Sequence, residues 1–193
     1  GKRIYSKSLY NSEQEIAYDL YRLMNNRDEP IEYDEDEIDR CLEDVQAEFS
    51  ITYGQDQLQA IKDAIKSPVF LLTGGPGTGK TTILRGITEV YMKLNKIDRK
   101  DAKGIKLAAP TGRAAQKMAN ATEMDASTIH HLLGITGGNE ISANDLDYLN
   151  GTLLNIHETS MVDTELMQML LYSIPNSIQV NFSLDKNQLP SVG

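Results

Sequence analysis

The feature that most constrains this chain is the run GGPGTGKTT at residues 74–82, which fits the pattern G-x-x-x-x-G-K-[ST]. The apolar stretch 69–72 precedes the run, and a helix-like pattern begins at Lys80. Glycines let consecutive backbone N–H groups turn toward a phosphate, and the next helix presents its positive N-terminal end. In such loops the lysine neutralises β and γ oxygens, and the hydroxyl is a ligand for Mg²⁺. We therefore assign nucleotide contacts to Gly75, Pro76, Gly77, Thr78, Gly79, Lys80, Thr81 and Thr82.

The sequence does not match two other motifs that its glycines and histidines suggest. The dinucleotide fingerprint G-x-G-x-x-G would need a glycine at its sixth position, counted from Gly75, where the chain has Lys80. The zinc motif His-Glu-x-x-His begins at His157, but its last position is Met161.

Apolar strand-like runs alternate with helical segments from about residue 51 onward, which indicates a parallel α/β sheet. We expect strands at 69–72, 105–109, 153–156 and 178–182, helices near 56–66, 80–94, 112–121 and 164–173, and a loop at 134–151. Residues 1–50 carry helical periodicity at 13–25 and 34–49, and we interpret them as a helical appendage to a domain at 51–193. In parallel sheets of this kind, ligands bind at the carboxyl ends of the strands.

The composition of the 193 residues, with 40% hydrophobic and 24% charged, is that of a folded globular chain. The net charge of −9 arises locally, because residues 28–48 hold 11 acidic residues and one basic residue. The remainder is nearly neutral, so nucleic acid is not excluded as a partner. The acidic load favours a solvated helix face over a binding surface. The single cysteine, Cys41, excludes an internal disulfide, and with no apolar run of roughly 18 residues we expect a cytoplasmic protein.

Several polar residues follow the predicted strands. Thr111, Gly112 and Arg113 open a helix after the strand at 105–109, where backbone amides and an arginine can contact a nucleic-acid phosphate. Without the neighbouring phosphate-loop motif, an ordinary helix cap with a solvated arginine would be the preferred interpretation. Farther along, Ser127 can cap a helix, and Thr128 and His130 can face DNA or pack against the helix.

Other candidates lie around the phosphate loop. Glu158 follows the strand at 153–156 and can position a water molecule, while Asp185 and Gln188 follow the strand at 178–182 and can reach the nucleotide. Gln57 stands one helix upstream, where a surface glutamine is the simpler interpretation.

The segments LTGGPGTGKTT, APTGRAA, STIHHLLG, HETSMVD and DKNQLPSVG resemble, in order and spacing, the RecD-type DNA helicases of superfamily 1. That family includes the alpha subunit of exodeoxyribonuclease V. The resemblance covers residues from about 54 to 193 and implies a RecA-like P-loop NTPase lobe that uses ATP and Mg²⁺ to move 5′ to 3′ on single-stranded DNA and to unwind duplex ends during recombination and repair. It also implies other subunits of a recombination nuclease as partners, and a second motor lobe beyond residue 193, which makes this chain a fragment.

By position, the resemblance implies a role for each candidate residue. It gives Gln57 an adenine contact, Thr81 and Glu158 the Mg²⁺ ion, and Lys80, Glu158 and Gln188 catalysis. Thr111, Gly112, Arg113, Thr128 and His130 would contact DNA.

The chain departs from the family pattern in three ways. His157 stands where the family has the Mg²⁺-binding Asp, and imidazole is a poor ligand for Mg²⁺. Asn155 and Asn181 place amides in apolar strands, where an unpartnered buried amide costs about 1–3 kcal/mol. Ser183 and Leu184 replace Val-Gly. We therefore hypothesise slow or absent ATP hydrolysis, and keep a non-hydrolysing nucleotide switch or assembly subunit as the alternative function.

Overall fold

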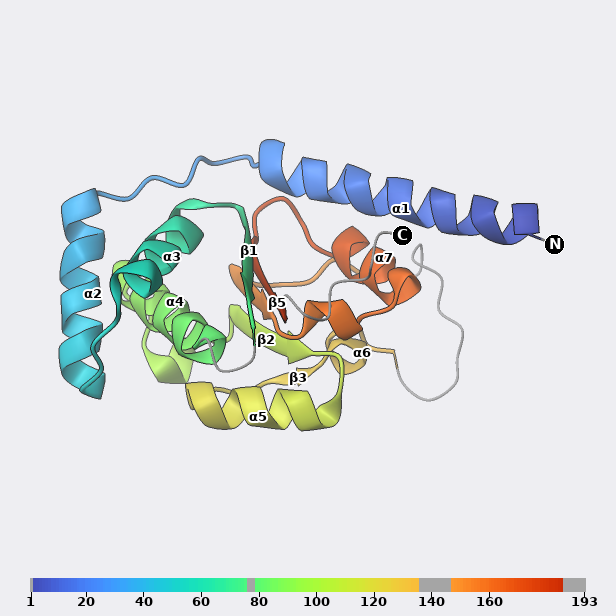
Figure 1. The fold of residues 1–193 in the computed structure, drawn as a ribbon. Coiled ribbons are helices and arrows are strands. Elements are labelled where there is room, and N and C mark those ends of the chain that lie inside the picture. Colours follow the sequence, from blue (N-terminus) through green and yellow to red (C-terminus); the bar gives the residue numbers. More distant parts are fainter. Residues whose placement is uncertain (1, 76–78, 136–146, 186–193) are drawn as a thin grey trace.

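The computed structural model describes residues 2–75, 79–135 and 147–185, and for residues 2–10 only the backbone. Its centre is a five-stranded sheet in the order β1-β5-β4-β2-β3, in which all pairs are parallel. Helices cover both faces of this sheet (Figure 1). The chain is therefore an α/β protein, as the alternating pattern predicts.

The element bounds lie close to the predicted ones in the sheet. The strands are β1 (Val69–Gly74), β2 (Ile105–Ala109), β3 (Ser127–Thr128), β4 (Leu153–Ile156) and β5 (Gln179–Asp185). The helices are α1 (Lys2–Asn25), α2 (Glu35–Phe49), α3 (Gln55–Lys66), α4 (Lys80–Leu94), α5 (Gly112–Thr122), α6 (Ile129–Leu132) and α7 (Thr164–Tyr172), with 3₁₀ turns η1 (Arg99–Asp101) and η3 (Thr159–Met161). The parts of the predicted loop 134–151 that are described hold no helix or strand, and its residues 136–146 lie outside the described residues.

The structure differs from the local predictions in three places. β3 was not predicted, because two residues are too few for an alternating pattern to be read. Ser127 does not cap a helix but belongs to β3, and Thr128 caps α6 by accepting a hydrogen bond from the His131 amide at 3.1 Å. The helix at the N-terminus also begins earlier than predicted, at Lys2.

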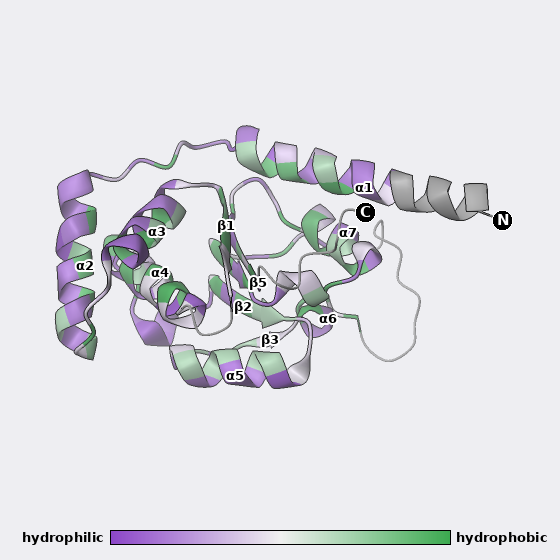
Figure 2. Ribbon diagram, viewed as in Figure 1, coloured by the Kyte–Doolittle hydropathy of each residue, from purple (hydrophilic) through white to green (hydrophobic). Residues whose placement is uncertain are grey.

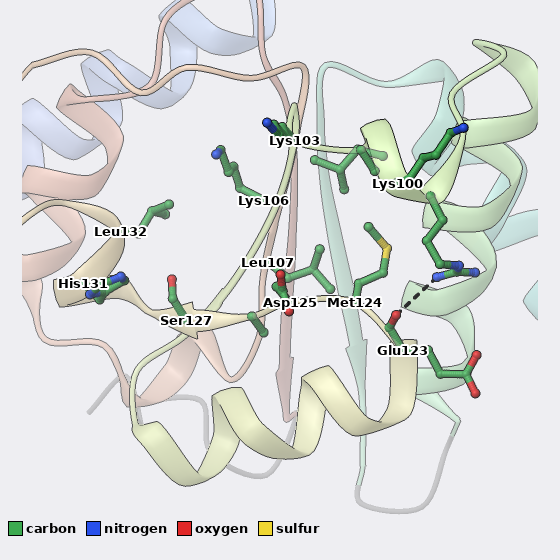
Figure 3. A pocket seen from close by; sticks show the side chains of 14 residues that line it. Lys100, Lys103, Lys106, Leu107, Glu123, Met124, Asp125, Ser127, His131 and Leu132 are labelled. Atoms are coloured by element: carbon green, nitrogen blue, oxygen red, sulfur yellow. Dashed lines mark hydrogen bonds between the residues drawn. The ribbon is translucent and has the colours of Figure 1, made fainter.

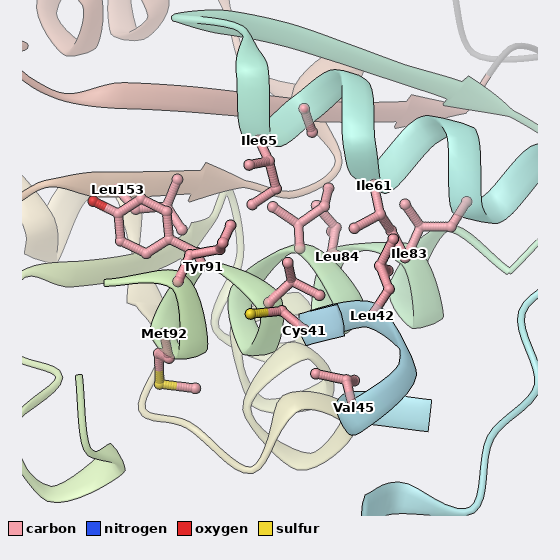
Figure 4. Packing of buried hydrophobic residues seen from close by; sticks show 14 of the residues in the cluster. Cys41, Leu42, Val45, Ile61, Ile65, Ile83, Leu84, Tyr91, Met92 and Leu153 are labelled. Carbon is pink, nitrogen blue, oxygen red and sulfur yellow. The ribbon is translucent and has the colours of Figure 1, made fainter. Parts of the chain in front are cut away.

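The two sheet faces carry separate cores. α2, α3 and α4 form one core with residues of β1, β2 and β4. Figure 4 shows Leu42 of α2 near Ile61 of α3, with Leu84 of α4 in the same cluster. α1, α6 and α7 form the other core with residues of β2, β4 and β5. Side chains alternate between these cores along each strand, so neighbouring residues of one strand face different helices.

The acidic helix α2 keeps one apolar face and one charged face, and Figure 2 shows the hydrophobic side turned toward α3 and α4. Its acids are partly neutralised by lysines of the domain, with ion pairs Lys62–Asp39 at 2.5 Å and Lys93–Glu48 at 2.7 Å and a further pair between Lys66 and Glu35. Exposed ion pairs contribute little to stability. The buried apolar face therefore holds α2 in place.

Helix α1 lies along α7 on the opposite face of the sheet (Figure 1). Leu23 is buried there, and Arg22 donates a hydrogen bond to the Leu171 carbonyl oxygen at 3.0 Å. Among the described residues, no helix is long and apolar enough to cross a membrane.

Candidate nucleotide site at the carboxyl ends of the strands

A cavity of about 430 Å³ opens where β1, β5 and β4 end. Phosphate-loop residues and polar side chains from the two neighbouring strand ends line it together. The lining residues are Gly75, Gly79, Lys80, Thr81, Lys117, His157, Glu158, Ser183, Leu184 and Asp185. The site thus forms at the edge of the sheet where ligands of parallel α/β folds bind.

Lys80, the first residue of α4, is held by both flanking strands. Its ammonium donates hydrogen bonds to the carbonyl oxygens of Gly74, at 2.9 Å, and Gly75, at 3.4 Å, and forms an ion pair with Asp185. Gly74 and Asp185 are register partners at the ends of β1 and β5. The lysine is therefore positioned at the loop before any phosphate is bound.

Gln57 lies beside the phosphate loop. Its Oε1 accepts a hydrogen bond from the Gly54 amide at 2.9 Å, which closes the first turn of α3. Its Nε2 is so near Gly79 that a Cβ added there would be 2.8 Å away. The glutamine is thus placed next to the loop, although it does not line the cavity.

Glu158 is the second residue after the end of β4 and is half-buried at the cavity. Its backbone is left-handed, with φ 54° and ψ 46°, where a residue other than glycine is strained. Strain of about 1–3 kcal/mol is typical of functional positions and persists only where the surroundings enforce it. The turn directs the chain from β4 into η3 with the carboxylate next to the phosphate loop.

His157 is buried at the end of β4 and pairs with Ser183 of β5, with Nδ1 and Oγ 2.7 Å apart. Burial lowers the pKa of the imidazole below its usual value, the Glu158 carboxylate opposes that shift, and the Lys80 ammonium reinforces it. The two departures from the family pattern at positions 157 and 183 therefore contact each other.

The strand amides are also paired rather than isolated. Asn181 Nδ2 donates to Asn155 Oδ1 at 2.9 Å, and Asn155 Nδ2 donates to Thr88 Oγ1 of α4 at 3.1 Å. The expected penalty for unpartnered amides is therefore confined to one atom of the pair, Asn181 Oδ1, which is buried without a hydrogen-bond partner.

The candidate DNA contacts come together on the neighbouring strands. Thr111 caps α5 by accepting a hydrogen bond from the Ala114 amide at 3.1 Å, and Gly112 and Arg113 are exposed in the first turn. β3 pairs with the end of β2, with Ala109 opposite Thr128. His130 is exposed on α6, so the two predicted segments lie at adjacent strand ends of the same sheet edge.

Sequence reasoning missed Lys117, an exposed residue of α5 that lines the cavity. It lies four residues after Arg113, so its place on a helix beside the site was the only signal that could have indicated it. Of the predicted contacts, Pro76, Gly77, Thr78 and Gln188 lie outside the described residues. Thr82 belongs to α4 and does not line the cavity.

A larger cavity of about 820 Å³ lies beside residues 105–107 of β2, which precede the two residues that pair with β3 (Figure 3). Leu107 and Met124 contribute apolar surface, and Lys100, Lys103 and Lys106 contribute positive charge. No phosphate-loop residue lines it.

The sequence matches the AAA domain family (AAA_19) over residues 57–193. It is 35% identical to the RecBCD enzyme subunit RecD of Haemophilus influenzae over 159 residues, which covers 70% of this chain and 24% of that protein. It is 33% identical over 138 residues to the ATP-dependent RecD2 DNA helicase of Deinococcus radiodurans, which covers 72% of this chain and 18% of that protein. The chain thus spans about a quarter or less of the length of these two relatives.

Two solved structures of Pif1 helicases share the fold. The first, from a study of DNA unwinding at forked double-stranded DNA by two coordinating Pif1 helicases, has a TM-score of 0.52 and 25% identity and covers 74% of this chain and 36% of that chain. The second, Pif1 from Candida albicans, has a TM-score of 0.51 and 24% identity and covers 74% of this chain and 34% of that chain. With a family match over residues 57–193 and relatives of the RecD type, the chain belongs to the AAA domain family and its sequence is of the RecD type.

Proposed function

We propose that this chain is the ATP-binding motor lobe of a 5′ to 3′ DNA helicase of the RecD type, acting on single-stranded DNA and duplex ends. One observation carries the proposal. The phosphate-loop lysine, Glu158 and Asp185 share one cavity, and the Thr111–Arg113 and Thr128–His130 segments lie at the neighbouring strand ends of the same sheet edge. A protein that only binds nucleotides does not need the Thr111–Arg113 and Thr128–His130 segments at this edge.

The residues of the cavity suit a nucleotide with Mg²⁺. Mg²⁺ prefers oxygen ligands, and Thr81, Glu158 and Asp185 bring a hydroxyl and two carboxylates to the cavity. When bound, the ion neutralises charge on the β and γ phosphate oxygens. His157 does not fit this role, because Mg²⁺ prefers hard oxygen ligands and an imidazole provides only nitrogen.

Each proposed residue then has a distinct task. Lys80 binds the β and γ oxygens in place of its present carbonyl partners, and Gln57 contacts the adenine beside Gly79. Glu158 holds the attacking water and receives its proton, since carboxylates act as general bases at hydrogen-bond distance. Gln188 contacts the γ-phosphate.

Helix α5 provides the physical link between DNA and nucleotide. Its first turn carries Thr111, Gly112 and Arg113, and its side carries Lys117 at the cavity. A shift of α5 when DNA binds therefore moves a positive charge relative to the phosphates. RecD relatives are named as subunits of the RecBCD enzyme, and we extend that partnership with other nuclease subunits to this chain as part of the proposal.

The test is DNA-stimulated ATP hydrolysis by the protein with both motor lobes present, at fixed salt, because nucleotide-driven steps need a cleft that closes. We expect single-stranded DNA to stimulate hydrolysis, Lys80→Ala to abolish it, and Arg113→Ala to reduce the stimulation. We expect no unwinding of a tailed duplex by residues 1–193 alone. Hydrolysis that DNA does not affect would exclude the motor function.

His157 favours a second candidate function, a nucleotide switch without turnover, because a histidine replaces the usual carboxylate. The same measurement separates the two functions. A protein that binds ATP through Lys80, hydrolyses none with DNA present and gains turnover in the His157→Asp variant is a switch.

A further inference from the structure

Position 157 cannot provide the negative charge that a Mg²⁺–nucleotide complex needs. An imidazole carries no negative charge in either protonation state, and this one is paired with Ser183. A carboxylate for the Mg²⁺ ion of this site must therefore come from another residue.

The strand order places the carboxylate of Asp185 at the same edge of the sheet as residue 157. β5 lies between β1, which leads into the phosphate loop, and β4, which ends before His157. Asp185 is the last residue of β5 and the register partner of Gly74 at the end of β1. Among the described residues that line the cavity, only Glu158 and Asp185 are acidic.

Of these two carboxylates, only that of Asp185 is paired with a cation among the described residues. It forms an ion pair with Lys80, and the two side chains are 22% and 11% exposed. Glu158 has no ion-pair partner among the described residues, which leaves it available to hold water.

Nucleotide binding changes the balance of this ion pair. When phosphate oxygens bind Lys80, the Asp185 carboxylate loses the one cation with which it forms an ion pair among the described residues, at a site that is largely shielded from water. A largely shielded carboxylate without a partner is unfavourable, so a second cation at the same place is favoured. Mg²⁺ on the nucleotide meets that need with the oxygen ligands that it prefers.

We propose that Asp185 provides the carboxylate for the Mg²⁺ ion of the bound nucleotide, in place of residue 157. The inference rests on the proposed nucleotide site and deepens it. It assigns the metal to the end of β5 rather than to the end of β4, with Thr81 as the hydroxyl ligand.

The experiment measures nucleotide affinity by calorimetry with a non-hydrolysable ATP analogue, once with Mg²⁺ and once with EDTA, so no turnover is needed. In the Asp185→Asn variant we expect the gain in affinity due to Mg²⁺ to fall by about tenfold or more, as is typical when a metal's carboxylate support is removed. In EDTA we expect its affinity to equal or exceed that of the unchanged chain, because Lys80 no longer has a competing carboxylate.

Two further variants make the result specific. His157→Asp in the Asp185→Asn background restores a carboxylate at the neighbouring strand end, and we expect it to recover the Mg²⁺ dependence. Asp125→Asn removes an exposed acid outside the cavity and serves as the matched control. Electron paramagnetic resonance of Mn²⁺ with the analogue reports the same change in metal environment directly, and circular dichroism checks that each variant is folded.

The outcomes separate this inference from the proposed function. If the unchanged chain binds no nucleotide, or Lys80→Ala binds as well as it does, the proposed site itself is wrong. If binding depends on Lys80 but Asp185→Asn keeps the full Mg²⁺ dependence, the nucleotide site stands and Asp185 is not the metal's carboxylate. A folded double variant that gains nothing from His157→Asp also overturns the inference.

Discussion

Asn181 of β5 donates a hydrogen bond to Asn155 of β4 at the same register position, with Nδ2 and Oδ1 2.9 Å apart. Both side chains point to the α4 side of the sheet, where Asn155 in turn donates to Thr88. Thr88 donates to the Leu84 carbonyl oxygen at 2.9 Å. A short polar chain therefore connects two central strands with the helix that begins at the phosphate loop.

This polar chain predicts a strongly non-additive double substitution. Asn155→Leu alone leaves Asn181 without its acceptor in the core, and we expect the free energy of unfolding to fall by about 1–3 kcal/mol. In Asn155→Leu/Asn181→Leu both partners become apolar, and we expect much of that loss to be recovered. Urea unfolding of the single and double variants measures the coupling. Additive losses would show that the two amides do not stabilise each other.

Alanine substitutions at two glycines with positive φ, Gly151 and Gly134, are expected to differ sharply in their effect on stability. The φ of Gly151 is 142°, and a Cβ would be 2.6 Å from the carbonyl oxygen of Gly104, a backbone atom that also accepts a hydrogen bond from Thr152 at 2.7 Å. We expect Gly151→Ala to destabilise the folded chain by more than backbone strain alone, which costs about 1–2 kcal/mol. Gly134, with φ 71° and nothing within 4 Å of a Cβ, is the control, and its alanine variant should show the strain only. An equal decrease in the melting temperature of the two alanine variants would contradict this prediction.

The pKa of His157 predicts a pH dependence of stability. Burial lowers that pKa in the folded chain, whereas the unfolded chain titrates near the usual value of about 6.5. Stability from the neutral imidazole is thus complete above the unfolded pKa and is lost as the pH falls through the folded pKa.

The measurement is the free energy of unfolding at pH 7.5 and pH 5.5, in EDTA and without nucleotide. We expect the unchanged chain to lose more stability on acidification than His157→Asn does, since all other titrating groups are common to both. A loss of equal size in the two proteins would assign the dependence to other residues.

Substitutions at Arg113 and Gly112 are expected to affect DNA binding in different ways. Arg113→Ala should weaken single-stranded DNA binding and lower the slope of log affinity against log salt by about one, as the loss of one phosphate contact does. Arg40, an exposed arginine on α2, provides the control for a lost positive charge.

No atom lies within 4 Å of a Cβ added at Gly112, so Gly112→Ala should leave the melting temperature nearly unchanged. It should reduce DNA affinity if the backbone approaches a phosphate closely. Fluorescence anisotropy over a salt series tests both variants, and an unchanged slope for Arg113→Ala would exclude its phosphate contact.

Much of the fold was predictable because its signals are local. The strands at 105–109 and 153–156 and the helix at 80–94 agree with the structure, since each is a continuous apolar run or a regular amphipathic stretch bounded by turn residues. β3 was not predictable, because its two residues become a strand only through pairing with Ala108 and Ala109.

The sequence by itself determined the phosphate loop and the family, because the eight-residue motif and the segments that follow it are continuous in the chain. Only the tertiary structure decided which polar groups meet. Lys80 and Asp185 are 105 residues apart, and Asn155 and Asn181, like His157 and Ser183, are 26 apart. Their contacts follow from a strand order in which β5 enters between β1 and β4, and local periodicity carries no information about that order. For this reason residues that looked like isolated departures from the family pattern form pairs in the folded protein.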